Sequence, residues 1–213
     1  MRRKIGILCL LTGLMCLCTY AWFVQSEQQA VADQLVRLHI VADSDDPADQ
    51  RVKLQVRDRI LPVISRLTEG CLNRSEAIRA LQSGLPSIRQ AASEALCAAG
   101  YSEEVQLSLQ PELFPRREYD TFSLPAGEYE TLRVTIGKGQ GHNWWCVAFP
   151  ALCLPASSEG VVEAARIAGL SDEQTDLLTG DSFDITLKFR LLDWLANLPF
   201  FQTPYAAAKT PAP

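Results

Sequence analysis

The amino-acid sequence predicts an α+β fold, a single domain in which an antiparallel sheet packs against helices, preceded by an N-terminal apolar leader. Apolar residues recur with helical spacing between residues 47 and 99, and again beyond residue 160. Over residues 105–149 the spacing changes to two, which is the period of strands. Because most of the predicted strands follow one another along the chain, they favour antiparallel pairing.

The first 26 residues are predicted to be a signal peptide or a signal anchor. Arg2, Arg3 and Lys4 precede an uncharged apolar run over residues 5–24. A helix rises about 1.5 Å per residue, so this run spans about 30 Å, the thickness of a bilayer core. The three cations are expected to stay in the cytoplasm while the rest of the chain is exported. If the leader is not cleaved, it holds the protein on the membrane.

The charge of the exported part excludes some partners. Without the three cations of the leader, 17 basic side chains face 25 acidic ones, a balance near −8. Nucleic acid and anionic lipid both require a basic surface, so neither is predicted as a partner. The length beyond the leader suffices for one core, and we place one domain at residues 27–199. Residues 200–213 lack periodicity and are predicted to be a disordered tail.

The first strand and helix are predicted from alternation and from a capping signal. Residues 36–42 alternate between apolar and mostly polar positions and are predicted to form the opening strand. Asp45 or Asp46 is expected to cap the helix that follows, which has proline in its first turn and an apolar stripe as far as Leu67.

Proline is expected to disturb both long helical segments. The first helix is predicted to kink at Pro62. A second helical region begins at Asn73 or Ser75, is interrupted near residues 84–86 and ends at Gly100.

The second half of the chain is predicted to form most of the sheet. Residues 105–109 and 119–124 are predicted strands, and residues 131–137 and 144–149 are predicted to form a hairpin across the glycine-rich turn between them. Helical spacing then predicts three helices at residues 161–168, 173–178 and 185–198.

Two adjacent tryptophans in the last predicted strand cannot point to the same side of a sheet. If Trp145 and Val147 face the core, Trp144 and Cys146 lie on the opposite side. An exposed Trp144 would then be a good anchor for a partner, because tryptophan is frequent among binding hot spots. Alternatively, helices cover both faces and both indoles are buried. The sequence leaves these two arrangements open.

Three of the seven cysteines lie in the leader and four in the exported part, where an even number favours disulfides. We predict a Cys146–Cys153 pair because Pro150 can turn the chain back over that short span. Closing the loop would stabilise the fold by about 2–3 kcal/mol. Buried reduced thiols are the alternative, favoured for Cys71 and Cys97 because both are expected where helix faces pack.

Neither a metal site nor a catalytic set is predicted. Four aspartates lie close together after the first strand, but the glycine and distal glutamate of an EF-hand loop are missing, so helix capping explains them better. His142, Asn143 and Cys146 suggest a thiol hydrolase. In an extended strand, however, residues four apart are about 13 Å from each other, too far for a nucleophile and its base. No cofactor is expected.

Two segments resemble a known family. GHNWWCVAFPALC at residues 141–153 and RLHIVADSDDPADQRVKLQVRD at residues 37–58 are similar to motifs of the stage II sporulation protein R family. The resemblance extends over residues 35–194. The family usually has asparagine at the position of Asp43, so a hydrogen-bond donor role is not carried over to that residue.

The resemblance implies a secreted, non-enzymatic signalling protein of endospore formation. It is expected to leave the forespore and enter the space between the two membranes. There it would activate a membrane-embedded aspartic-type protease of the mother cell, of the stage II sporulation protein GA type, which processes the sigma-E precursor. The residues expected to contact this partner are His39, Asp43, Ser44, Asp45, His142, Asn143, Trp144 and Trp145. A lone strand histidine such as His39 is otherwise most often structural.

Two other functions are kept as alternatives. An exported cell-wall hydrolase would use His142 or Cys146 on peptidoglycan. A carbohydrate-binding module would stack Trp144 on a sugar ring. The absence of a plausible catalytic set and the two motifs together favour the signalling function.

Overall fold

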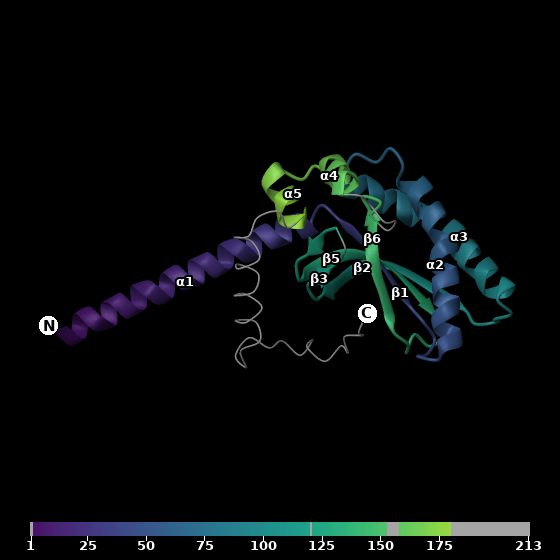
Figure 1. Ribbon diagram of the computed structural model, residues 1–213, viewed down its shortest axis with the longest axis horizontal. Coiled ribbons are helices and arrows are strands. Elements are labelled where there is room, and N and C mark those ends of the chain that lie inside the picture. The colour runs from purple at the N-terminus through teal and green to yellow at the C-terminus, as the bar shows by residue number, and fades with distance from the viewer. Residues whose placement is uncertain (1, 120, 153–157, 180–213) are drawn as a thin grey trace.

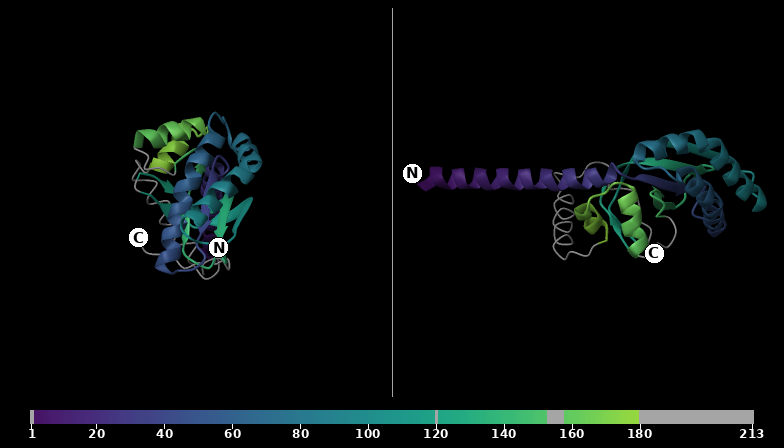
Figure 2. Two further views of the ribbon diagram at one scale, coloured as in Figure 1. Left: turned by 90° about the vertical axis from the view of Figure 1, so that its right-hand side faces the viewer. Right: turned by 90° about the horizontal axis from the view of Figure 1, so that it is seen from above.

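The computed structural model describes residues 2–119, 121–152 and 158–179. In these ranges a four-stranded sheet carries two long helices, α2 and α3, on one face (Figures 1 and 2). The elements in chain order are α1 (Arg2–Ala32), β1 (Val36–Val41), α2 (Pro47–Thr68), α3 (Arg74–Ala98), β2 (Val105–Phe114), β3 (Arg117–Glu118), β4 (Ser123–Leu124), β5 (Gly127–Ile136), β6 (Asn143–Phe149), α4 (Ser158–Ile167) and α5 (Asp172–Thr179). The α+β class is confirmed.

The predicted hairpin is wrong, because β1 lies between its two strands. The strand order is β2-β5-β1-β6, with β1 parallel to β5 and antiparallel to β6. The sheet is therefore mostly antiparallel but contains one parallel pair. Every residue of β1 is buried, as is typical of a central strand covered on both faces. Alternation along the chain identifies a strand but not its neighbours, which is why the sequence suggested the simpler pairing.

The helix caps are confirmed. The side chain of Asp46 accepts a hydrogen bond from the backbone N–H of Ala48 at 2.9 Å, and α2 begins with Pro47. The side chain of Asn73 accepts from the backbone N–H of Glu76 at 3.0 Å. In both cases a free N–H of the first turn gains a partner.

The predicted interruption of the second helical region is wrong. α3 runs without a break from Arg74 to Ala98, and α2 likewise continues through Pro62. Gly84 is buried where α3 packs on α2, and a Cβ there would overlap the side chain of Leu67. The glycine therefore permits close helix packing instead of ending the helix.

The predicted strand at residues 119–124 is instead part of a small hairpin. β3 and β4 are two residues each and pair antiparallel with each other, separately from the main sheet. The N–H of Tyr119 donates to the carbonyl of Phe122 at 2.8 Å, and the two rings stack at 4.5 Å. The predicted helices at residues 161–168 and 173–178 correspond to α4 and α5, whereas that at 185–198 and the tail at 200–213 lie outside the described residues.

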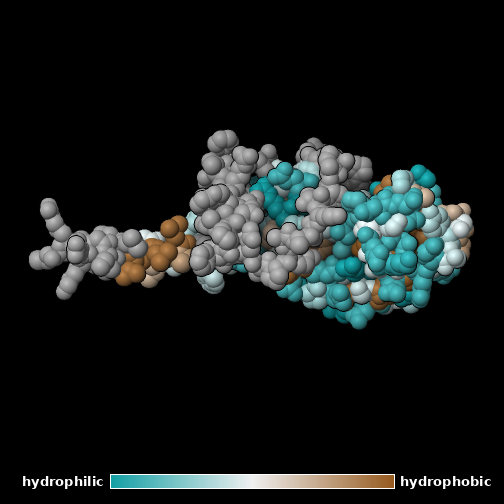
Figure 3. Space-filling view, turned by 90° about the horizontal axis from the view of Figure 1, so that it is seen from below, coloured by the Kyte–Doolittle hydropathy of each residue, from teal (hydrophilic) through white to brown (hydrophobic). Residues whose placement is uncertain are grey.

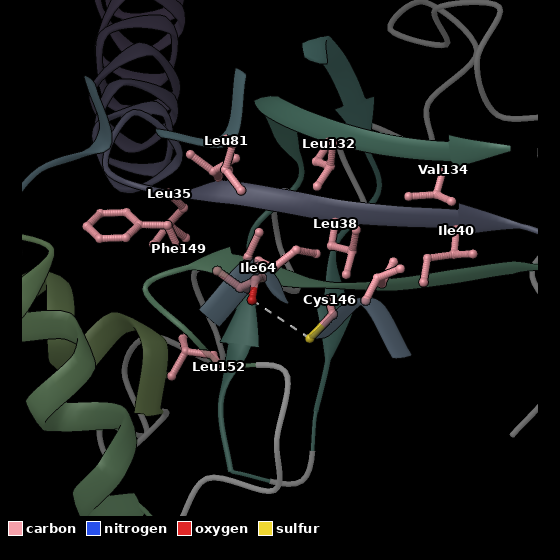
Figure 4. Packing of buried hydrophobic residues seen from close by; sticks show 14 of the residues in the cluster. Leu35, Leu38, Ile40, Ile64, Leu81, Leu132, Val134, Cys146, Phe149 and Leu152 are labelled. Atoms are coloured by element: carbon pink, nitrogen blue, oxygen red, sulfur yellow. Dashed lines mark hydrogen bonds between the residues drawn. The ribbon is translucent and has the colours of Figure 1, made fainter. Parts of the chain in front are cut away.

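The core lies between the sheet and the pair α2 and α3. Leu38 and Ile40 of β1 are fully buried, and Leu132 pairs with Leu38 in the parallel register. Figure 4 shows these side chains together with Ile64 of α2 and Cys146 of β6. One face of the sheet is thus apolar and covered by helices, and the residues that alternate with this set point to the other face.

α1 projects from the domain for most of its length (Figures 1 and 2). Its C-terminal end packs on the domain, where Val31 and Ala32 are buried and Gln29 Nε2 donates to the carbonyl of Glu128 at 3.1 Å. Hydrophobic side chains cover the described part of α1 in Figure 3, beside a largely hydrophilic domain surface. Among the described residues, no helix reaches the length and hydropathy needed to cross a membrane. The leader at residues 1–26 stays a prediction.

Candidate functional site

The two sequence motifs lie side by side. β1 and β6 pair antiparallel, so that His39 lies opposite Trp145, and Val41 lies opposite Asn143. The end of β1 and the start of β6 therefore meet at one end of the sheet. The loops that extend them, residues 42–46 and 137–142, form the candidate site.

Backbone hydrogen bonds join these two loops. The N–H of Gln140 donates to the carbonyl of Asp43 at 3.0 Å, and that of Gly141 to the carbonyl of Ala42 at 3.0 Å. The carboxylate of Asp43 accepts from the N–H of Lys138 at 2.5 Å. Gly137 and Gly139 have positive φ values of 56° and 64°, which let the chain reverse over the end of β1. Asp43, predicted as a contact residue, is thus occupied in holding the glycine-rich loop.

Ser44 ties the first loop to the start of α2. Its hydroxyl donates to Asp49 Oδ2 at 2.5 Å and accepts from the N–H of Asp46 at 3.1 Å. Its carbonyl accepts from the side chain of Gln50 at 2.8 Å. Nearby, the nearly buried Lys53 donates to the carbonyl of His142 at 3.0 Å, and burial lowers the pKa of this lysine. Ser44 therefore has a structural role at this site.

The outermost pair of the site is exposed. His142 Nδ1 contacts the carboxylate of Asp45, and the two side chains are 43% and 58% exposed. One residue comes from each loop, so the pair marks the surface where the two motifs meet. Of the predicted contact residues, these two are the most available to a partner.

His39 lies on the sheet face opposite the helices and is buried there. Its Nδ1 lies 2.8 Å from Glu112 Oε2, and its Nε2 lies 2.9 Å from Asn143 Oδ1. Arg133 donates to the other oxygen of Glu112 at 3.2 Å. Burial alone would raise the pKa of Glu112, but the hydrogen bond and charge of His39, together with Arg133, lower it below its usual value. His39 and Asn143 are therefore parts of a polar network that extends across all four strands of the main sheet.

This network predicts a pH-dependent stability. A carboxylate with a lowered pKa stabilises the fold above its unfolded pKa, and the contribution is lost as the pH falls through the folded pKa. Wild type is therefore expected to be more stable than Glu112→Gln at about pH 5, and the margin should shrink as the pH falls below that value. Urea unfolding across this range measures it. In a His39→Gln background the pH-dependent margin should be smaller, and an undiminished margin in acid would contradict the assignment.

The two tryptophans lie on opposite faces, and both are partly buried. Trp144 is on the helix side, opposite Ile40, with the guanidinium of Arg57 from α2 5.2 Å from its ring centroid. Trp145 is on the other face, 5.8 Å from His39 between ring centroids. The arrangement with an exposed Trp144 is therefore wrong, because the register of β6 against β1 pairs Trp144 with Ile40 on the helix side and leaves it partly buried. Neither indole is fully buried, which the alternative arrangement expected of both.

The burial of one cysteine differs from the prediction. Cys97 is free but exposed, whereas it was expected at a packing face, and Cys71 is free and half-buried. Burial raises the pKa of the Cys71 thiol. Cys146 takes part in a disulfide, and Cys153, its predicted partner, lies outside the described residues. The Cys146–Cys153 pairing therefore stays a prediction.

The site does not join a nucleophile to a base within the described ranges. Cys146 is 4% exposed and points towards the helices, whereas His142 lies in the exposed loop and contacts Asp45. In the same part of the chain no group of three or more histidine, cysteine or acidic side chains is arranged to hold a metal ion.

Comparison with known proteins identifies the family. A sequence model of the stage II sporulation protein R family matches residues 32–159, which include both loops of the site. The chain belongs to the stage II sporulation protein R family. It is 32% identical over 193 residues to stage II sporulation protein R of Bacillus subtilis (strain 168), covering 82% of this chain and 86% of that protein. No solved structure gives a significant match.

The stage II sporulation protein R family gives this chain a role in sporulation. The matched residues begin at the last residue of α1 and extend past β6, so they span the whole sheet with α2 and α3. Both motifs recognised in the sequence fall within them. The part of the chain that carries the family resemblance is thus the domain that builds the site.

Sequence reasoning missed two residues of this domain. Glu112 is separated from His39 by 73 residues along the chain, and no local pattern connects them. Arg37 is fully buried next to His39 on β1, although arginine is rarely buried. No local signal pointed to this burial, because residues 36–42 alternate as a half-buried strand does and Arg37 stands at a polar position of that alternation.

Proposed function

We propose that this protein is a secreted signal of endospore formation that activates a membrane-embedded aspartic-type protease of the mother cell by contact. The protease in turn processes the sigma-E precursor. The role of the family in sporulation supports an action during endospore formation. The charged and apolar pattern of residues 1–26 supports export from the cell that makes the protein.

The observation that carries the proposal is the exposed pair at the junction of the two motifs. Asp45 and His142 come from loops about 100 residues apart that are held together by backbone hydrogen bonds. A rigid loop pair presents its side chains with little loss of conformational entropy on binding, which favours recognition by contact. The side chains of Asp43, Ser44 and Asp46 are occupied within the fold, so activation by contact agrees better with this surface than catalysis does.

The test is reconstitution of the full chain with the protease in liposomes, with precursor cleavage as the readout. The double variant Asp45→Ala/His142→Ala is expected to fold and to activate about tenfold less, as when an interface contact of about 1.4 kcal/mol is removed. The matched control is Arg59→Ala/Glu94→Ala, which removes an exposed pair between α2 and α3, 62% and 49% exposed. Its activation should equal that of wild type.

Two outcomes would contradict the proposal separately. If the Asp45/His142 double variant activates as well as wild type, the contact surface is wrong. If wild type produces no cleavage above the protease alone, direct activation is wrong.

A further inference from the structure

Arg37 is a buried cation without an anionic partner among the described residues. Its Nη2 donates to the hydroxyl of Tyr119 at 2.8 Å, and its Nε donates to the carbonyl of Cys146 at 3.3 Å. The guanidinium lies over the rings of Phe114 and Tyr129, at 4.1 and 5.1 Å from their centroids. Its Nη1 is buried and has no hydrogen-bond partner. Buried charges are normally paired with an opposite charge, so an anion is the partner that this guanidinium lacks.

A second unpaired donor lies on the same sheet face. The indole Nε1 of Trp145 is buried without a hydrogen-bond partner. Trp145 and Arg37 belong to adjacent strands and point to the same side, since Arg37 lies opposite Val147. The hydroxyl of Tyr119 connects them, because it accepts from Arg37 and donates to the carbonyl of Trp145 at 3.3 Å.

The charges around these donors favour a single negative charge. The guanidinium of Arg117 lies 5.2 Å from the ring centroid of Trp145, and it adds a second cation. The carboxylate on this face, Glu112, is already occupied by His39 and Arg133. Burial lowers the pKa of Arg37, and the neighbouring charge of Arg117 acts in the same direction. An anion placed here would relieve both effects.

We infer that Arg37 and Trp145 form a binding site for a carboxylate group. The guanidinium Nη1 and the indole Nε1 each donate one hydrogen bond, which suits the two oxygens of a carboxylate. A phosphate would need more donors than these two. The aromatic surroundings, Phe114 and Tyr129, accommodate the apolar stem of an acidic side chain or of a chain terminus.

The cover of this site is the β3–β4 hairpin. Arg117 begins β3 and Tyr119 follows it, and both lie against the two donors. The hairpin pairs with no strand of the main sheet, but Phe122 and Leu124 anchor it in the core. Entry of a carboxylate therefore requires the side chains of Arg117 and Tyr119, and not the whole hairpin, to move aside.

The source of the carboxylate is assigned to a protein partner, and this part rests on the proposed function. An acidic residue of the activated protease would enter the site from the face opposite α2 and α3. Arg37 lies near the start of β1 and the exposed pair Asp45 and His142 lies beyond its other end, so a partner that contacts both must extend along β1.

The site is tested on the purified full chain with sodium acetate as the probe, replaced by sodium chloride at equal ionic strength. Acetate is expected to raise the melting temperature of wild type in a concentration-dependent manner. Trp145→Phe keeps the ring but removes the donor, and should bind acetate about tenfold more weakly. Trp144→Phe, the neighbouring indole on the opposite face, is the matched control and should respond as wild type does. Arg37→Lys removes the guanidinium and, provided that the variant folds, should also bind acetate more weakly than wild type.

Three results would overturn the site: no difference between acetate and chloride in wild type, an undiminished response in Trp145→Phe, or an equal response to inorganic phosphate, which would exclude carboxylate selectivity. The partner is tested with Trp145→Phe in the liposome assay, where about tenfold lower activation is expected. Full activation by this variant, with acetate binding reduced, would overturn the partner assignment. Absence of activation by wild type would instead count against the proposed function and leave the acetate result standing.

Discussion

Replacing Gly141 with alanine is expected to lower the free energy of unfolding by about 2–4 kcal/mol, because two loop hydrogen bonds are lost and their groups are left unpaired. A Cβ at this position would overlap the backbone carbonyl of Ser44 and lie 2.9 Å from the Cβ of Ala42. Backbone atoms cannot move aside as a flexible side chain can, so the loops that join the two motifs must separate. Gly141 has no positive φ, and the effect therefore comes from close approach alone.

The measurement is urea unfolding of Gly141→Ala beside a matched glycine. Gly127→Ala places a Cβ at ordinary contact distances, 3.5 Å from Gln29 Oε1 and 3.6 Å from the ring of Tyr129. It should change the unfolding free energy by less than about 0.5 kcal/mol. Equal stability of the two variants would mean that the loops are not packed as described.

Replacing Leu38 with alanine is expected to cost about 3–5 kcal/mol, since it leaves a cavity in a core that cannot collapse fully around it. Leu38 has no exposed surface and lies between Leu132 of β5 and Cys146 of β6. β1 joins these two strands, so the cavity would weaken both pairings of the central strand. The loss is a large part of the total stability of a typical domain.

Thermal or urea unfolding checks this value against Leu72→Ala. Leu72 is 74% exposed between α2 and α3, so its truncation should cost less than about 0.5 kcal/mol. A cost below about 1 kcal/mol for Leu38→Ala would contradict the central place of β1 in the core.

The sequence predicted the elements better than their arrangement. Each cap was narrowed to two candidates, Asp45 or Asp46 and Asn73 or Ser75, because a capping side chain lies within three residues of the N–H from which it accepts; the structure has Asp46 and Asn73. Gly84 was read as an interruption because its effect depends on Leu67 in another helix. The candidate site was predicted as two motifs, but that Asp43 and Ser44 hold the loops together, leaving Asp45 and His142 exposed, follows from contacts between the loops. Whether these residues contact a partner stays a prediction.

By itself, the sequence determined the α+β class, the helix starts and the family. These depend on periodicity, capping and motif identity, which are encoded in neighbouring residues. Only the tertiary structure decided that β1 lies between β5 and β6, that His39 contacts Glu112, and that Arg37 is buried without an anion. Strand order and burial depend on the summed packing of segments far apart in the chain, and no short stretch of sequence carries that sum.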